Sequence, residues 1–402
     1  MHEIELLTST EGQSLLASLP PYDADTILPL TAQLRAAGHA PELIAAALTQ
    51  SRLRARAKEK FGEFAEQMLF TADGLEQATR LRVGAIHAQR FVRAGAKRVI
   101  DFGCGIGADA LAFAASGLEV RAIERDATTA AAARHNLLPF PEAEVIHGDG
   151  FAIDLASLSA DAIWIDPARR AGGKRVANPD KWFPPLITAV ELAQQFPAAG
   201  IKLAPGIDYA YLPAESHVQW ISAGGDLLEA VLWLGQAAPQ PGRSALIISG
   251  NATYSYDAGA SDPSQHPDLV SPRELGKYVF EPDPAIIRSG AIEAVCREFE
   301  LAPVSDGLAY LTGDKPISSP FLTGFAVDAV HRIEAKAVGK HLRATGVGRV
   351  EIKKRGTDLD PAAFRKKLKL DSKLPGAAVL LASPLLGKHR IIQAHRVNDR
   401  QK

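Results

Sequence analysis

The sequence has 402 residues, 47% hydrophobic and 23% charged, which is the composition of a soluble chain long enough for two or three domains. Its first residues, MHEIELLTS, lack the basic segment of a secretion signal, and its longest apolar stretch, GAAVLLASPLL, is too short to span a bilayer. Two cysteines, Cys104 and Cys296, exclude a disulfide framework and a zinc site built from cysteines. We therefore expect a cytoplasmic protein without a membrane partner.

The charge is unevenly distributed along the chain. Residues 331–402 carry 18 Lys and Arg against 6 Asp and Glu, a net charge of +12. The first 330 residues carry 27 against 40, a net charge of −13. A basic C-terminal module on an acidic body indicates a polyanionic partner, most simply nucleic acid, and the alternative is a lysine-rich surface that only contacts water.

Residues 1–95 are expected to be helical. Pro41 is placed to begin a helix that extends to Leu69, because apolar residues recur at helical spacing. Asp73 followed by Glu76 resembles a capping box for a second, continuous helix that leads into the strand at Val99.

Strands and helices alternate from Arg98 onward. Near-continuous apolar strands joined by helices predict an α/β fold, a doubly wound, Rossmann-like and mostly parallel sheet, over residues 96–250. Further strands are expected at 228–235 and 244–249, and residues 250–272 are expected to be loop. The first five strands are expected at 98–102, 119–124, 143–149, 161–167 and 200–205.

The remaining residues predict smaller α+β units. Residues 251–314 form a connecting segment with a strand, turn and helix over 277–295 and a strand over 307–313. The basic domain then takes residues 315–402, with strands near 325–331 and 348–356, a helix over 360–370 and a hairpin over 377–397.

The stretch 99–107, VIDFGCGIG, has the features of a cofactor-binding loop. Gly103, Gly105 and Gly107 let the backbone approach a ligand closely, and the following helix offers unpaired N–H groups at its start. The same pattern satisfies the dinucleotide fingerprint G-x-G-x-x-G/A, so the glycines alone leave the cofactor open.

Acidic residues at the ends of consecutive strands decide between the cofactors. Asp101, beside the glycine turn, would repel a pyrophosphate and attract the ammonium and sulfonium of S-adenosylmethionine. Glu124, 19 residues after Gly105, is placed to accept hydrogen bonds from a ribose diol, and Asp149 ends the third strand. These residues predict an S-adenosylmethionine site at the carboxyl edge of the sheet.

Asp166 begins the sequence DPARR at the end of the fourth expected strand. From about residue 70 to 250 the chain resembles class I S-adenosylmethionine-dependent methyltransferases, in which an acid such as Asp149 lies near the adenine amino group and D/N-P-P-Y/F/W orients an acceptor amine. The resemblance assigns acceptor contacts to Asp166 and the Pro167 carbonyl. Ala168 and Arg169 depart from this motif, and Arg169 is placed to stack on the acceptor or to hold a phosphate.

Further cations follow in the same loop. Because cations near a sulfonium are unfavourable unless they face an anion, they favour an acceptor with phosphate or carboxylate groups, and salt bridges to the acidic body are the alternative. Two aromatic residues, Trp182 and Phe183, are candidates for stacking on a base or for burial. The cations are Arg169, Arg170, Lys174 and Arg175.

The chain also resembles a bacterial family of methyltransferases with a C-terminal THUMP-like domain. That resemblance implies that the helix before the first strand covers the cofactor, which puts Gln77 and Thr79 near it, and that the acceptor is RNA. The segments that carry it are residues 75–91, 165–170, 277–290 and 348–370.

We therefore expect an S-adenosylmethionine-dependent methyltransferase of structured RNA, either rRNA or tRNA. No metal is expected, because the histidines lack ligand spacing. Three alternatives remain open: a noncatalytic RNA-binding protein that keeps a cofactor pocket, a methyltransferase of an anionic small molecule or protein, and a dehydrogenase.

Overall fold

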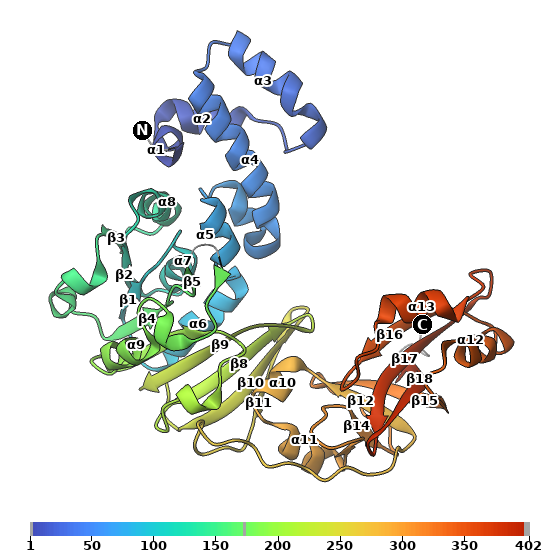
Figure 1. Cartoon of the computed structure of the whole chain (residues 1–402). Helices are drawn as coiled ribbons and strands as arrows, with labels where there is room; N and C mark the ends of the chain where they lie inside the picture. The colour runs from blue at the N-terminus through green and yellow to red at the C-terminus, as the bar shows by residue number, and fades with distance from the viewer. Residues whose placement is uncertain (1–2, 172–173, 398–402) are drawn as a thin grey trace. The chain divides into compact units, whose positions relative to one another are not determined.

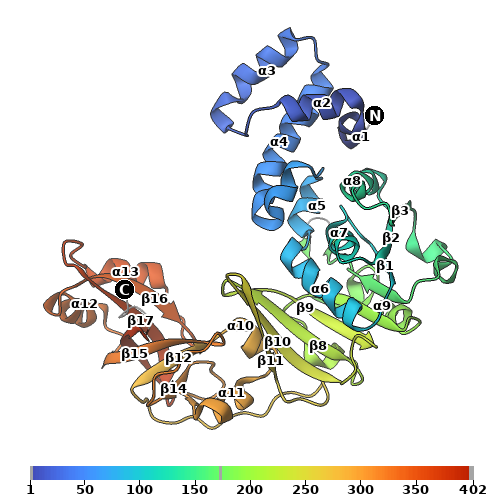
Figure 2. The same ribbon diagram turned by 180° about the vertical axis from the view of Figure 1, so that it is seen from behind.

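The computed structural model describes residues 3–171 and 174–397, with only the backbone of residues 170, 171, 174 and 175. The chain forms two compact units (Figures 1 and 2), and the division falls inside strand β9 (Asp226–Gly235). The first unit contains the chain up to Leu203 and Leu232–Pro239, and the second contains Ala204–Val231 and the chain from Gln240 onward. No helix within the described residues has the length and apolar character needed to cross a membrane.

The N-terminal region is helical, as expected. The helix that begins at Pro41 ends at Phe61, short of the predicted Leu69, because Gly62 adopts a left-handed φ of 58° that breaks the helical path. A short 3₁₀ helix, Gly62–Glu66, follows it. The helices before the first strand are α1 (Glu3–Thr8), α2 (Thr10–Ser18), α3 (Ile27–Ala36), α4 (Pro41–Phe61), α5 (Ala72–Gln77) and α6 (Leu81–Arg93).

The prediction of one continuous helix before the first strand is wrong. The chain leaves the helical conformation between α5 and α6, and we call residues 78–80 the elbow. The cap of α5 is Thr71, whose Oγ1 accepts the Gly74 N–H, and not Asp73. Tertiary contacts of Thr79, described below, account for the break.

The first unit contains the predicted parallel sheet. Strand β1 (Arg98–Phe102) pairs in parallel with β2 (Glu119–Glu124) and with β4 (Ala162–Ile165). Outside them, β3 (Ala143–His147) pairs with β2, and β7 (Ala198–Leu203) pairs with β4. The order β7-β4-β1-β2-β3 therefore reverses direction between β1 and β4.

Helices cover this sheet. Helices α7 (Ala108–Ala115) and α8 (Ala127–Leu137) join β1, β2 and β3, and α9 (Leu186–Ala193) joins β4 to β7. Because such crossovers are right-handed, α7 and α8 cover one face and α9 covers the other. No crossover closes the crevice between the carboxyl ends of β1 and β4, the usual ligand position in open α/β sheets.

Other short elements complete the first unit. A two-stranded ribbon consists of β5 (Arg170–Ala171) and β6 (Lys174–Arg175). Short 3₁₀ helices of the described residues are Ala24–Thr26, Gly150–Ala152, Leu155–Leu158 and Pro179–Lys181, and Tyr209–Tyr211 in the second unit.

The second unit begins with strands that continue the α/β pattern. Strand β10 (Gly242–Ser249) pairs in parallel with β8 (His217–Ala223) and antiparallel with β11 (Ala252–Asp257). The prediction that residues 250–272 are loop throughout is therefore wrong over β11. This strand, ATYSYD, is polar and largely exposed, so it lacks the apolar signal of a buried strand.

A seven-stranded, mostly antiparallel sheet with four helices forms the rest of the second unit. Two apolar clusters pack on it, one with α12, α13 and β16, and one that includes Val279, Tyr310 and Phe325. The predicted hairpin over 377–397 is confirmed as β17 and β18. The elements are β12 (Tyr278–Pro282), α10 (Pro284–Arg288), α11 (Ile292–Phe299), β13 (Ala302–Pro303), β14 (Leu311–Gly313), β15 (Leu322–His331), α12 (Ala335–Ala344), β16 (Val347–Lys354), α13 (Pro361–Leu368), β17 (Gly376–Leu385) and β18 (Lys388–Arg396).

A buried amide side chain holds the glycine loop against the segment before α5. Asn136 of α8 accepts the Leu69 N–H at 2.7 Å and donates to the carbonyl oxygens of Leu69 at 3.0 Å and Ile106 at 2.9 Å. Replacing it strands three backbone groups in the interior, which is costly because each loses its hydrogen bond.

We predict that Asn136→Ala lowers the free energy of unfolding by roughly 3 kcal/mol, as expected for stranded backbone groups. Chemical denaturation of the wild type and the variant measures this free energy. Gln194→Ala, which removes an exposed amide at the end of α9, is the control and should change stability by less than about 0.5 kcal/mol. Equal effects of the two variants would contradict the assignment.

Candidate functional site

The glycine loop between β1 and α7 is bound to β2 and remains open to a ligand. Gly103, Gly105 and Gly107 have left-handed φ values of 83°, 56° and 82°, which only glycine adopts without strain. The N–H groups of Gly103 and Cys104 donate to the Ile123 carbonyl, both at 3.0 Å. A side chain at Gly105 would meet no atom within 4 Å, so the backbone there is accessible.

Glu124 lies at the end of β2 and contacts the glycine loop directly. Its Oε2 accepts the Gly105 N–H at 3.0 Å, and its Oε1 accepts the Asp126 N–H at 2.8 Å. The structure thus brings together two of the residues predicted to hold the cofactor, and these contacts fix the carboxylate at the edge of the sheet.

Asp101 is enclosed beneath the glycine loop, with 1% of its surface exposed. Burial raises its pKa well above the ordinary value, and the nearby Asp109 and Asp166 carboxylates act in the same direction. Its Oδ2 atom has no hydrogen-bond partner in the described part of the chain. A buried carboxyl oxygen without a partner is suited to a hydrogen-bonding ligand group.

Asp149 follows β3 and is exposed, and its carboxylate accepts the Phe151 N–H at 3.0 Å. The Phe151 ring is also exposed and lies 5.2 Å from the Phe102 ring and 6.2 Å from the Phe183 ring, measured between centroids. Two exposed aromatic rings, Phe151 and Phe183, therefore lie near each other, and one of them is two residues from this acid.

Asp166 follows β4 and is paired with a residue that the sequence reasoning missed. Lys202, at the end of β7, donates from Nζ to Asp166 Oδ2 at 2.9 Å and to Thr79 Oγ1 at 2.9 Å. Lys202 is only 4% exposed. A lysine within the apolar strand sequence GIKLAP was the available signal for it.

The sequence reasoning also missed two buried polar residues on helices, His87 of α6 and Asp109 of α7. Thr79 Oγ1 donates to Asp109 Oδ2 at 2.6 Å, and His87 Nδ1 lies 2.9 Å from Asp109 Oδ1. Burial alone would raise the pKa of Asp109, but the hydrogen bond and charge of His87, together with Lys202 and Thr79, lower it below the ordinary value. Asp109 therefore remains an anion inside the protein.

The chain after Asp166 carries the rest of the motif. The Ala168 N–H donates to the Phe183 carbonyl at 2.8 Å, and the Phe183 N–H donates back to the Ala168 carbonyl at 3.0 Å. The exposed Phe183 ring therefore stands beside the motif, whereas Trp182 is buried and donates to the Val176 carbonyl at 2.8 Å.

The cations of this loop are only partly described. Arg169 is half-buried, and its carbonyl accepts the Val176 N–H at 2.8 Å. The side chains of Arg170, Lys174 and Arg175 lie outside the described residues. Gln77, a predicted cofactor residue, is the last residue of α5, and its side chain is exposed.

Three families match parts of the chain. A domain of unknown function (DUF8688) matches residues 1–57, the methyltransferase small domain matches 64–178, and the THUMP domain-like family matches 322–396. Uncharacterized S-adenosylmethionine-dependent methyltransferases from two strains of Mycobacterium tuberculosis, CDC 1551 / Oshkosh and ATCC 25618 / H37Rv, are 33% identical over an alignment of 342 residues. The match covers 82% of this chain and 90% of each relative. The chain belongs to the S-adenosylmethionine-dependent methyltransferases.

A crystal structure supports the fold of this methyltransferase. The protein, from Porphyromonas gingivalis W83 and itself described as a methyltransferase, superposes with a TM-score of 0.74 at 22% identity. The match covers 94% of this chain and all of that one. The same fold therefore extends over both units of the chain.

The residues present fit S-adenosylmethionine. The accessible backbone at Gly105, the carboxylate of Glu124 and the unpartnered oxygen of Asp101 lie at the carboxyl ends of β1 and β2. Among the described residues, no group of three or more His, Cys, Asp or Glu side chains is placed to hold a metal ion.

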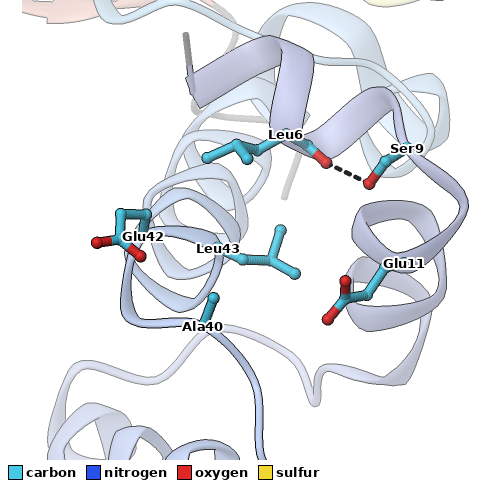
Figure 3. A pocket seen from close by; sticks show the side chains of 6 residues that line it. All are labelled: Leu6, Ser9, Glu11, Ala40, Glu42 and Leu43. Atoms are coloured by element: carbon cyan, nitrogen blue, oxygen red, sulfur yellow. Dashed lines mark hydrogen bonds between the residues drawn. The ribbon is translucent and has the colours of Figure 1, made fainter. Parts of the chain in front are cut away.

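A cavity of about 280 Å³ lies elsewhere, among the N-terminal helices (Figure 3). Glu11 and Glu42 line it with apolar residues, and Ser9 donates to the Leu6 carbonyl at its edge. None of its lining residues belongs to the glycine loop or the DPARR motif, so it is not the methyltransferase site. The lining residues are Leu6, Ser9, Glu11, Ala40, Glu42 and Leu43.

The raised pKa of Asp101 gives a prediction for stability. In the unfolded chain this carboxyl ionises at the ordinary pH, whereas the folded chain releases the proton only at a higher pH, so the wild type loses stability as pH rises above about 4. We predict that Asp101→Asn unfolds near the wild-type temperature at pH 4 and at a higher temperature at pH 8. Each kcal/mol relieved corresponds to roughly 2–4 °C in thermal unfolding. A temperature difference independent of pH would contradict the enclosed, protonated carboxyl.

Proposed function

We propose that this enzyme methylates structured RNA, either rRNA or tRNA. The observation that carries the proposal is the THUMP domain-like match over residues 322–396 in the part of the chain with a net charge of +12. THUMP domains bind RNA, and a strongly basic domain on an acidic body favours a polyanion. We also propose a cytoplasmic location, which the two free, buried cysteines support.

The proposed RNA surface lies on the two helices of the basic domain. Lys336 and Lys340 of α12 and Lys366 and Lys367 of α13 are exposed, while the apolar faces of both helices pack on the sheet. Arg343 instead donates to the Leu368 and Lys369 carbonyls and so joins the helices. Its contacts leave the neighbouring lysines available for phosphates.

We propose that the cofactor lies along the carboxyl edge of the sheet. S-adenosylmethionine supplies an electrophilic methyl group on its sulfonium. The proposed cofactor residues come from the region before β1, the glycine loop and the ends of β1, β2 and β3. They are Gln77, Thr79, Asp101, Gly103, Gly105, Gly107, Glu124 and Asp149.

We propose that Asp166, the Pro167 carbonyl and Arg169 orient the acceptor. A carboxylate held by Lys202 accepts a hydrogen bond from the acceptor, and Arg169 contacts an adjacent phosphate or base. Such groups accelerate transfer by positioning, because a methyl group moves in line between donor and acceptor and needs little further chemistry. The exposed Phe183 ring supplies the aromatic surface that the motif itself lacks.

We predict that Asp166→Ala lowers methyl transfer at least about 100-fold, because the acceptor is no longer held in line. The assay measures labelled methyl groups transferred to total RNA from cells that lack the enzyme. Calorimetry should give an S-adenosylmethionine affinity within a few fold of the wild type. Asp268→Ala, an exposed acid in a loop, is the control. Full-rate transfer by Asp166→Ala would overturn the assigned role.

We predict that RNA affinity falls steeply with salt and that Lys366→Glu with Lys367→Glu makes the dependence shallower. Each lost phosphate contact lowers the slope of log affinity against log salt by about 0.7–0.9. Filter binding of total RNA at salt concentrations from about 50 to about 200 mM measures the slope. The control replaces Arg93 and Lys97, two exposed cations before β1, by glutamate, which reverses the same number of charges. An unchanged slope in the double lysine variant would exclude this surface.

A further inference from the structure

The elbow between α5 and α6 is fixed from outside by a lysine. Lys60 of α4 donates from Nζ to the carbonyl oxygens of Leu75 and Glu76, both at 2.8 Å, and of Ala78 at 2.9 Å. These carbonyls lie at the C-terminal end of α5, where a cation is favoured by the helix dipole. The backbone of the elbow therefore has a defined position relative to α4.

The elbow is fixed from inside by a buried chain of polar contacts. Thr79 donates to Asp109 and accepts from Lys202, and Lys202 also donates to Asp166. Thr79 is 5% exposed and Lys202 4%, so water competes little for these bonds. The ammonium of one residue thus joins a residue before β1 to the carboxylate that follows β4.

Close packing transmits the position of α5 to the glycine loop. A Cβ at Gly74 would lie 2.4 Å from Ile106 Cγ2, so α5 approaches the loop as closely as a glycine allows. A shift of α5 therefore moves both the loop that faces the cofactor and the elbow that contacts Lys202.

Fold stability alone gives no reason for an ammonium at this position. A buried charge loses its hydration, and replacing a buried ion pair by apolar residues of similar volume is often neutral or stabilising. A methionine at residue 202 would fill similar space without this cost, but it would leave Asp166 and Thr79 unconnected.

We propose that Lys202 is a positioning residue that couples the cofactor side of the site to the acceptor side. It holds the Asp166 carboxylate in an orientation that depends on Thr79, so the acceptor group is arranged only when the elbow is in place. This inference rests on the proposed roles of Thr79 and Asp166, and its test uses cofactor affinity so that it does not depend on the RNA acceptor.

The test is a double-mutant cycle on S-adenosylmethionine affinity, measured by calorimetry with the full chain. Thr79→Val and Asp166→Asn are made singly and together, once in the wild-type chain and once in the Lys202→Met chain. With Lys202 present, we expect the double variant to differ from the sum of the single variants by at least about threefold in affinity. With methionine at residue 202, the two effects should be additive.

Two outcomes overturn the coupling: additive or absent effects when Lys202 is present, or equal non-additivity after its replacement. Lys97→Met, an exposed lysine before β1, is the matched control and should keep the wild-type coupling. If Lys202→Met does not fold, Lys202→Gln keeps a hydrogen-bond donor without the charge and replaces it in the cycle. Lys202→Arg should restore most of the coupling, because it keeps a cation.

Methyl transfer to total RNA gives a second readout. The titratable groups that act on Asp166 are Lys202 from β7, which donates to its carboxylate, and Asp101 from β1, which is close enough to interact with it. Lys202→Met removes the cation and leaves the carboxylates, so the pH of half-maximal transfer on the acid side should rise; an unchanged profile would contradict the positioning role. Loss of transfer by the wild type, with coupling intact in the cycle, would overturn the RNA proposal alone.

Discussion

The reversal of strand order between β1 and β4 is the constraint on which the methyltransferase site depends. Crossovers leave in opposite directions from these strands, so their carboxyl ends share an open crevice. The glycine loop and the DPARR motif meet there, and a Cβ at Gly103 would lie 3.6 Å from the Asp166 carbonyl oxygen. The proposed cofactor loop on one strand and the proposed acceptor motif on the other are therefore neighbours by topology.

The polar groups beneath this crevice divide their roles by environment. Asp101, Asp109 and Asp166 are close enough to interact, and Lys202 supplies one cation among them. Hydrogen bonds to His87 and Thr79 keep Asp109 ionised, whereas burial and its neighbours raise the pKa of Asp101. Identical side chains thus have pKa values shifted in opposite directions, because a low-dielectric interior magnifies small differences in contacts.

The sequence predicted the parts of the fold whose signal is local. The apolar strands β1, β2 and β4 and the glycine loop follow from composition and spacing over a few residues. The break at Thr79 does not, because its cause is Lys202, which lies 123 residues away along the chain. The sequence GIKLAP predicts a strand and assigns no role to Lys202, and the polar strand β11 had no apolar pattern to reveal it. The candidate site was therefore predictable on its glycine and acidic residues, and its buried connections were not.

The boundary expected at residue 315 divides what the structure builds as one sheet. Strand β12 pairs antiparallel with β15, and Val279 and Tyr310 share an apolar cluster with Phe325. The turn-forming residues after Gly313 predicted a domain boundary there. Strand pairing across that boundary is nonlocal, so no local sequence pattern predicts it. The connecting segment thus supplies part of one apolar cluster on the sheet that it shares with the basic domain. Helices α12 and α13 direct their apolar residues into the other cluster, so their lysines remain outside, where a polyanion can reach them.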